Sequence, residues 1–230
     1  MDTLPIQAFS VKAFPTALAR LLFFIHQRPG IPRCLQKPLP LIFLALMPLL
    51  GGCAGDTRHQ MIISAADQKM VLLRDGRPAR TYPVSTSKFG LGDTHGSNTT
   101  PLGKLRVRKK IGDDMPAGTV FKSRVPTGEV LPVDAPGRDP IVTRILWLEG
   151  LEPRNRNAFS RYIYIHGTPE ERNIGQPVSY GCIRMRSSDV IELFETVGEK
   201  AQVFITPQPL PPGLAQVGQT DDPGGSRLPL

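Results

Sequence analysis

A cysteine and a histidine in the second half of the chain have side chains that can do covalent chemistry together. Cys182 follows the tight stretch Ser179-Tyr180-Gly181, and His166 ends the alternating segment Arg161-Tyr162-Ile163-Tyr164-Ile165. An unperturbed thiol has a pKa of about 8.5, so only a few per cent is ionised at neutral pH, and a nearby imidazole raises that fraction. The pair therefore predicts a cysteine nucleophile with a histidine base.

The segment before His166 has the period of a β-strand. Ile163 and Ile165 point to one face, while Tyr162, Tyr164 and His166 share the other. We therefore expect the imidazole to end a strand on its polar face, opposite the turn that holds the cysteine.

The turn itself suggests how an oxyanion could be stabilised. Gly181 permits a tight turn and the close approach of a substrate. Consecutive backbone N–H groups at Tyr180, Gly181 and Cys182 could form an oxyanion hole. No Asp or Asn is placed by spacing to orient His166, so the carbonyl of Gly167 is the expected partner.

The three cysteines predict different fates. Cys34 lies in a leader, and Leu50-Gly51-Gly52-Cys53 follows a twelve-residue apolar run, residues 39–50, that is too short to span a bilayer. This resembles a bacterial lipobox, which predicts a signal over residues 1–52 and lipidation of Cys53. Cys182 is then the single thiol of the mature domain, either reactive or a buried, inert side chain.

Charge argues against one class of partner. Removing residues 1–52 leaves 23 basic and 19 acidic residues, so the net charge falls from +8 to +4. Such a mild excess, without a basic stripe interleaved with aromatic residues, predicts no nucleic-acid partner and suits a protein near an anionic wall or membrane. The basic run 106–110 is expected at an exposed strand edge.

The pattern predicts one mostly β domain over residues 61–206, after a linker over residues 53–60. Asp75-Gly76 separates two extended segments, 69–74 and 77–85, as in a hairpin. Further strands are expected at 104–107, 141–148, 162–166 and 202–206. One short helix is expected at 189–197, with Ser187 or Ser188 as N-cap and Gly198 as the stop. The Pro- and Gly-rich residues 207–230 predict a disordered tail.

His166-Gly167-Thr168, followed after a loop by Ser179-Tyr180-Gly181-Cys182-Ile183-Arg184, resembles the signature of the L,D-transpeptidase (YkuD-type) family. The segments 82–87 and 100–103 also resemble family segments. The resemblance implies the mixed, β-sandwich-like catalytic fold of that family, with one short helix after the cysteine, and it implies neither a metal nor an organic cofactor.

The resemblance also implies a reaction on peptidoglycan stem peptides. Cys182 would be acylated by a tetrapeptide stem and would transfer the acyl group to a diaminopimelate amine, giving a 3-3 cross-link, or to an amine of a wall-attached protein. His166 would be the base, Gly181 and its neighbours the oxyanion hole, and Arg184 and Ser179 would contact the substrate. Arg184 could equally be a structural ion-pair partner.

One position departs from the family pattern, which usually has histidine immediately before Gly-Cys where this chain has Tyr180. A phenol can donate a hydrogen bond or stack, yet it cannot be protonated as an imidazole can. Two alternatives stay open: an L,D-carboxypeptidase or amidase that uses water as acceptor, and a catalytically silent wall-binding lipoprotein.

The other candidates have simpler interpretations. His95 is expected on a surface loop and His59 in the linker, and a zinc site from His95, His166 and Cys182 is disfavoured because no short paired ligand spacing exists. Trp147 is expected in the core. Ala54 after the lipobox cysteine predicts a periplasmic protein that is lipid-anchored at the inner face of the outer membrane.

Overall fold

The computed structural model describes residues 55–215. The chain divides into two units, residues 1–49 and 50–230, and every described residue belongs to the second. The predicted leader, the predicted lipidation site Cys53 and the end of the predicted tail, residues 216–230, lie outside the described residues. Between residues 55 and 215, no helix is long and apolar enough to cross a membrane.

The described residues form a mostly β domain with a mixed sheet, as predicted. The strands follow the order β3-β2-β1-β10-β4-β7-β5-β6, while β8 pairs with β7 and with β9. The β1·β10 and β8·β9 pairs are parallel. The bounds are β1 His59–Ser64, β2 Lys69–Arg74, β3 Arg77–Pro83, β4 Gly103–Ile111, β5 Thr119–Lys122, β6 Val125–Val130, β7 Ile141–Gly150, β8 Tyr164–Gly167, β9 Ile183–Met185 and β10 Gln202–Thr206.

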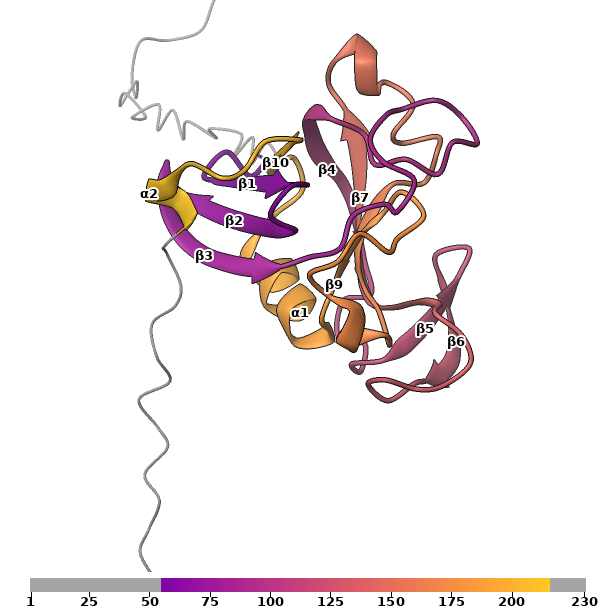
Figure 1. The fold of residues 1–230 in the computed structure, drawn as a ribbon. Coiled ribbons are helices and arrows are strands. Elements are labelled where there is room, and N and C mark those ends of the chain that lie inside the picture. Colours follow the sequence, from indigo (N-terminus) through magenta and orange to yellow (C-terminus); the bar gives the residue numbers. More distant parts are fainter. Residues whose placement is uncertain (1–54, 216–230) are drawn as a thin grey trace, which may run out of the picture. The chain divides into compact units, whose positions relative to one another are not determined.

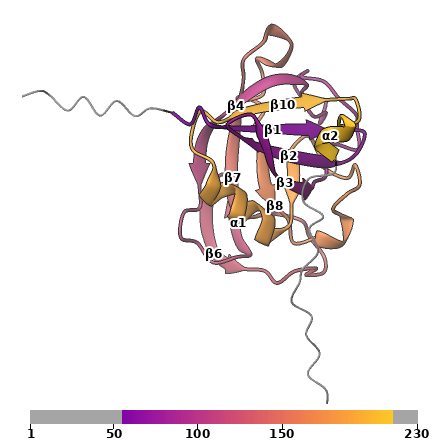
Figure 2. The same ribbon diagram turned by 90° about the vertical axis from the view of Figure 1, so that its left-hand side faces the viewer.

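The sheet curves around one apolar core. Buried side chains from β1 and β2 join those of β8, β9 and the helix α1 (Ser187–Thr196) in a single cluster. Figure 2 shows β1, β2 and β10 running across the more upright β7 and β8. Distant parts of one continuous sheet therefore enclose the core in the sandwich-like manner that was predicted.

The hairpin at Asp75-Gly76 is confirmed. β2 and β3 pair antiparallel, with Arg74 opposite Arg77. Asp75 and Gly76 have φ of 52° and 75°, the left-handed values that a two-residue turn requires at both central positions.

Helix α1 starts two residues earlier than predicted. Its N-cap is Arg186, which makes no side-chain cap bond, so neither predicted serine is the cap. Instead, the N–H of Ser187 donates to the Glu171 carboxylate at 2.7 Å. Glu171 belongs to the short helix η2 (Glu171–Asn173), so a tertiary partner replaces the local serine. The helix packs against β7 and β8 (Figure 2).

The basic run 106–110 is not an exposed edge. It lies in β4, between β10 and β7 in the middle of the sheet, because the alternating apolar side chains of Leu105 and Val107 enter the core. Arg106 pairs with Glu149 at 2.6 Å. Lys110 donates to the carbonyl of Val197 at 2.8 Å and lies over the ring of Phe194.

The domain is longer than residues 61–206 at both ends. β1 begins at His59, which the sequence placed in a linker, and its Nδ1 lies 2.8 Å from the carboxylate of Asp56. After β10 the chain packs back on the sheet, with Leu210 buried against Val71 and Leu73. The prediction of disorder is therefore wrong for residues 207–214, the last three of which belong to the short helix α2 (Pro212–Ala215) (Figure 1).

Candidate active site

The parallel pair β8·β9 brings the predicted nucleophile and base to one face of the sheet. Ile165 is aligned with Ile183, and both side chains enter the main core. By alternation, His166 and Cys182 point to the opposite face. Cys182 lies one residue before β9 and His166 is opposite Arg184, so the two are diagonal to each other. Diagonal neighbours in a sheet are roughly 7–8 Å apart, a span that an imidazole and a thiol can close.

His166 is buried, and a backbone carbonyl orients its ring. Its Nδ1 lies 2.8 Å from the carbonyl oxygen of Gly167. A carbonyl oxygen only accepts, so Nδ1 carries the proton and Nε2 keeps a lone pair. Burial lowers the pKa of the imidazole to about 4, against the opposing effect of the Gly167 carbonyl and with a further lowering by the charge of Arg184. The ring is therefore neutral at physiological pH and can accept a proton.

Cys182 is partly buried beside the same strand. Its Sγ lies 3.5 Å from the carbonyl oxygen of Tyr162, and it packs against an apolar cluster that includes Tyr164 and Trp147. Burial raises the pKa of the thiol to about 11, although a backbone hydrogen bond from Tyr164 and the charge of Arg184 oppose the rise. The resting pair is therefore a neutral thiol with a neutral imidazole. The thiol must lose its proton as it attacks, and His166 Nε2 has the lone pair to accept it.

The turn before Cys182 is held by the side chain of Ser179. Ser179 Oγ accepts the N–H of Gly181 at 3.2 Å and donates to the carbonyl of Cys182 at 2.6 Å. Ser179 is fully buried, so its side chain shapes the turn, and its predicted contact with the substrate stays a prediction. Of the predicted oxyanion donors, Gly181 therefore already has a partner.

Gly181 is required by its backbone and its surroundings. Its φ is 116°, and a Cβ there would lie 3.2 Å from the carbonyl oxygen of Thr99 and 3.3 Å from Ile163. Its own carbonyl accepts the hydroxyl of Thr100 at 3.1 Å. The segment before β4 thus clamps the turn before Cys182, a contact that spacing along the sequence does not reveal.

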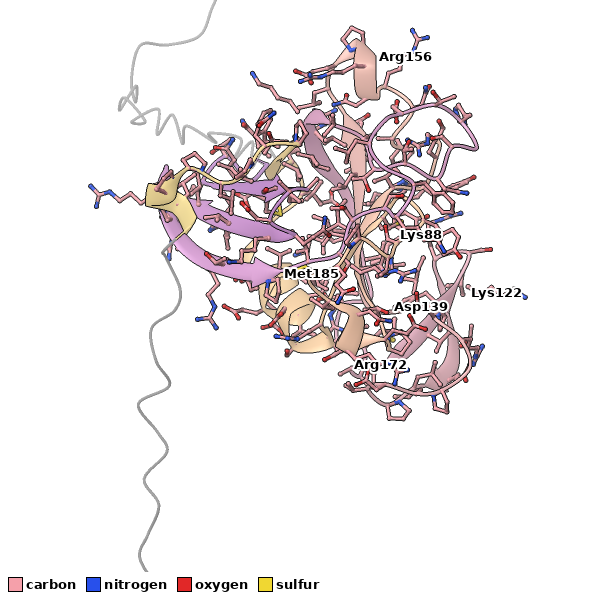
Figure 3. The ribbon with its side chains drawn as sticks, in the orientation of Figure 1. Lys88, Lys122, Asp139, Arg156, Arg172 and Met185 are labelled. Atoms are coloured by element: carbon pink, nitrogen blue, oxygen red, sulfur yellow. The ribbon has the colours of Figure 1, made fainter. Side chains whose placement is uncertain are left out.

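Arg184 makes a buried ion pair. Its Nη2 lies 2.5 Å from the carboxylate of Asp139, and both side chains are largely buried. Asp139, labelled in Figure 3, also accepts the hydroxyl of Thr168 at 2.5 Å. Of the two roles considered for Arg184, the structure favours the ion pair, although the guanidinium still influences both catalytic groups.

A bulge in β7 supports the orienting carbonyl. The β7·β8 register shifts between Val142 and Ile145, and the buried Thr143 has a φ of 73°, a strained value for a β-branched residue. A Cβ on Gly167 would lie 2.8 Å from the carbonyl oxygen of Val142 and 3.0 Å from Thr143. The bulge and the glycine therefore fit each other next to His166.

The remaining candidates lie apart from this pair or serve the core. His95 is exposed, and its Nε2 lies 3.3 Å from Ser160 Oγ. Within residues 55–215, no three His, Cys, Asp or Glu side chains are grouped to hold a metal ion. Trp147 is in the core as predicted, where it stacks on Phe159 with ring centroids 4.1 Å apart.

Sequence comparison gives the same domain over the same residues. The model of the YkuD family, the L,D-transpeptidase catalytic domain, matches residues 58–205, well over half of the chain. The chain belongs to the L,D-transpeptidase family. The match begins one residue before β1 and ends one residue before the end of β10, so it covers the sheet except for Thr206.

Individual L,D-transpeptidases match at different levels. The putative L,D-transpeptidase YqjB of Bacillus subtilis is 48% identical over 167 residues, which cover 72% of this chain and 82% of that protein. The probable L,D-transpeptidase YbiS of Escherichia coli K12 is 27% identical over 231 aligned positions. These cover 98% of this chain and 65% of YbiS, so the chain spans less than two thirds of that relative's length.

A crystal structure of L,D-transpeptidase 3 from Mycobacterium tuberculosis, in complex with a faropenem-derived adduct, is 19% identical, with a TM-score of 0.42. The superposition covers 65% of this chain and 60% of the other.

Tyr180, where the L,D-transpeptidase pattern usually has histidine, takes part in an exposed cluster of one cation and two rings. Its hydroxyl accepts a hydrogen bond from Lys88 Nζ at 3.0 Å, and its ring lies 5.4 Å from that of Phe89. Lys88, labelled in Figure 3, comes from the segment after β3. The phenol therefore interacts with a lysine that no motif singled out.

Sequence reasoning also missed an ion pair that braces the site. Arg161 and Asp93 pair at 2.9 Å, with both side chains 5% exposed. Arg161 also donates to the carbonyl of Thr99 at 2.7 Å, next to the residue that clamps Gly181. The two partners are 68 residues apart, and neither lies in a recognisable motif, so only the fold brings them together.

Proposed function

We propose that this chain is an L,D-transpeptidase that acts on peptidoglycan tetrapeptide stems through a thioester on Cys182. The observation that carries the proposal is the β8·β9 pairing, which places His166 of β8 diagonal to Cys182, the residue just before β9, next to a glycine turn. The family match over residues 58–205 supports the same reaction class.

The first half-reaction acylates the thiol. Sγ of Cys182 attacks the carbonyl that precedes the terminal D-alanine while the thiol proton passes to Nε2 of His166. The carbon–nitrogen bond then breaks, and the imidazolium returns the proton to the leaving amine. Because both groups rest in neutral forms, proton transfer accompanies attack and does not precede it.

The second half-reaction transfers the acyl group. An amine of a diaminopimelate side chain, or of a wall-attached protein, loses a proton to His166 and attacks the thioester. The new amide forms and the thiol is restored. Backbone N–H groups of Tyr180 and Cys182 are the proposed oxyanion donors, since the N–H of Gly181 is bonded to Ser179.

Product analysis tests this function. Full-length protein is incubated with disaccharide tetrapeptide, and the products are read by mass spectrometry. We expect a cross-linked dimer with release of one D-alanine per dimer. Tripeptide alone would contradict transfer and would indicate water as the acceptor.

An active-site label separates an enzyme from a silent wall-binding protein. A carbapenem should add one adduct to the intact mass, and Cys182→Ala should lose it. Cys34→Ser, which removes a leader thiol, should keep the adduct. An unchanged wild-type mass together with no product would contradict the enzyme.

We further propose that the mature chain is a periplasmic lipoprotein. The support is the apolar run at residues 39–50, followed by Leu50-Gly51-Gly52-Cys53 and then by Ala54. Acyl chains on Cys53 would anchor the protein, at about 0.8 kcal/mol for each buried methylene. Ala54 favours the inner face of the outer membrane.

A further inference from the structure

Three arginines surround the catalytic strand pair, and two of them are neutralised. Arg161 pairs with Asp93 at 2.9 Å, and Arg184 pairs with Asp139 at 2.5 Å. The charge of each of these guanidinium groups is therefore balanced by a carboxylate, and both ion pairs are largely buried.

Arg124 is the exception. Within residues 55–215, no carboxylate oxygen lies within 4.0 Å of its guanidinium. Its one hydrogen bond goes to a neutral group, the hydroxyl of Tyr164, at 3.2 Å. Arginine has five N–H donors in a planar fork, so most of them are left for another acceptor.

Aromatic rings hold the Arg124 guanidinium in place. Its central carbon lies 4.8 Å from the ring centroid of Trp147 and 4.8 Å from that of Tyr162. Stacking of this kind fixes the plane of the fork while leaving its N–H edge available. The side chain is therefore pre-organised, and little conformational entropy remains to be lost when an anion binds.

The backbone of the hairpin also favours this placement. Ser123 and Arg124 form the two-residue turn between β5 and β6, with φ of 51° and 69°. Such turns normally carry Asn or Gly, and each left-handed non-glycine residue stores strain. An arginine at this position therefore lowers the stability of the turn through backbone strain, and a function of its side chain would explain why it is there.

The guanidinium lies next to the nucleophile. Tyr164, its hydrogen-bond partner, shares a face of β8 with His166 and belongs to the apolar cluster against which Cys182 packs. Tyr162, one of the two stacking rings, has the carbonyl that Cys182 Sγ contacts at 3.5 Å. A ligand that is hydrogen-bonded to Arg124 would thus lie close to the Cys182 thiol.

We propose that Arg124 binds a carboxylate of the donor stem and so determines which stems acylate Cys182. This inference rests on the proposed function, because the stem is the substrate assumed there. A carboxylate accepts two parallel N–H bonds from a guanidinium, and such a pair would neutralise Arg124. Arg124 is then a specificity residue, with His166 and Cys182 left to do the chemistry.

The first test needs no transpeptidation. Cys182 is alkylated in the full chain with iodoacetate, which carries a carboxylate, and with neutral iodoacetamide, and the Cys182 peptide is quantified by mass spectrometry. The ratio of the two rates cancels the ionised fraction of the thiol. We expect Arg124→Gln to lower this ratio roughly tenfold, the loss of one charge-assisted interaction.

Lys122→Gln is the matched control for that ratio. It removes one positive charge from the same hairpin, and Lys122 is exposed and extends outward from the domain (Figure 3). The ratio should be unchanged in Lys122→Gln, and Arg124→Lys should recover it in part. An equal ratio in wild type and Arg124→Gln would overturn the proposal, and an unchanged iodoacetamide rate would show that the variant site is intact.

The second test uses the donor itself. Arg124→Gln should raise KM for a tetrapeptide donor about tenfold with little change in kcat. Donors in which one carboxylate at a time is amidated identify the group that Arg124 binds: the donor that lacks this carboxylate should react equally with wild type and variant. Equal KM values for every donor would overturn the proposal. If none of the donors acylates the wild-type protein, the proposed function fails. The alkylation ratio then still decides whether Arg124 binds carboxylates.

Discussion

His166 and Cys182 both rest uncharged, and burial is the common cause. Taking a group out of water disfavours its charged form, so burial lowers the pKa of the imidazole and raises that of the thiol. The pair therefore differs from a preformed thiolate and imidazolium. In the proposed reaction, the thiol of Cys182 therefore transfers its proton to His166 while it attacks the substrate.

The resting state predicts the pH dependence of alkylation. Since the pKa of Cys182 is raised to about 11, the reactive thiolate increases as pH rises through that value. At pH 7 the iodoacetamide rate should be about 300-fold below that of a free cysteine of pKa about 8.5, because the thiolate fraction is lower by that factor. A pH–rate profile between 6 and 11 measures this, and an inflection below pH 8 would indicate an ion pair instead.

Gly167 predicts a second residue-scale effect. In Gly167→Ala the new Cβ would meet Val142 and Thr143 at 3.0 Å or less, so the carbonyl that orients His166 must move. We expect a loss of stability of about 1–3 kcal/mol, as for other overpacked sites, together with slower acylation by a carbapenem. Urea unfolding and stopped-flow acylation measure the two effects.

Gly213→Ala is the control for that variant, because Gly213 lies in α2 and a Cβ there meets nothing within 4 Å. Gly213→Ala should change neither the free energy of unfolding nor the acylation rate by much. Acylation of Gly167→Ala at the wild-type rate would contradict an orienting role for the carbonyl.

Among the elements, the short strands β8 and β9 position the proposed catalytic pair and depend on their neighbours for their own placement. The bulge in β7 fits Gly167 at the end of β8, and the segment before β4 clamps the turn before β9. The Arg184–Asp139 pair ties β9 to the residue that precedes Pro140 and β7. These contacts join parts of the chain that are distant in sequence, and they set the geometry of the site.

The Arg184–Asp139 pair predicts a large coupling. Asp139→Ala would leave the guanidinium buried without its partner, so we expect a loss of about 3 kcal/mol in the free energy of unfolding. Adding Arg184→Met should cost much less than the sum of the single changes, because it removes the orphaned charge. Urea denaturation of the four proteins measures the cycle.

Glu129→Ala supplies a comparison, since Glu129 pairs with Arg138 at an exposed site. Exposed pairs contribute about 1 kcal/mol or less. If Asp139→Ala cost no more than Glu129→Ala, the buried pair would not fasten β9 to β7.

At the scale of the whole molecule, the proposed lipid anchor precedes the L,D-transpeptidase domain in the sequence. β1 begins at His59, five residues after Ala54, so the fold starts close to the proposed attachment site at Cys53. An anchor there would keep the site near the membrane, where peptidoglycan stems of the adjacent wall are within reach.

The anchor predicts a defined cellular behaviour. In a Gram-negative host, the full chain should incorporate labelled palmitate and should fractionate with outer membranes, whereas Cys53→Ser should do neither. Ala54→Asp should move the lipidated protein to the inner membrane, and Cys34→Ser should behave as wild type. Wild-type protein free of label and of membrane would contradict the anchor.

The sequence by itself determined what depends on nearby residues. The period of two before His166 assigned its face, and Asp75-Gly76 defined a hairpin, because pleat and turn geometry are local. The motif around Cys182 identified the nucleophile candidate and the family. Local patterns failed for the basic run in β4 and for residues 207–214, whose burial depends on distant strands.

Only the tertiary structure decided which charges face the site and which are neutralised. Arg184 is paired by Asp139, 45 positions away, and Arg124 is left unpaired beside Tyr164. Ser179 is buried and supports the turn, a role that its place in the motif did not indicate. The physical reason is that pairing and burial arise from contacts between residues far apart in the chain, which spacing along the sequence does not encode.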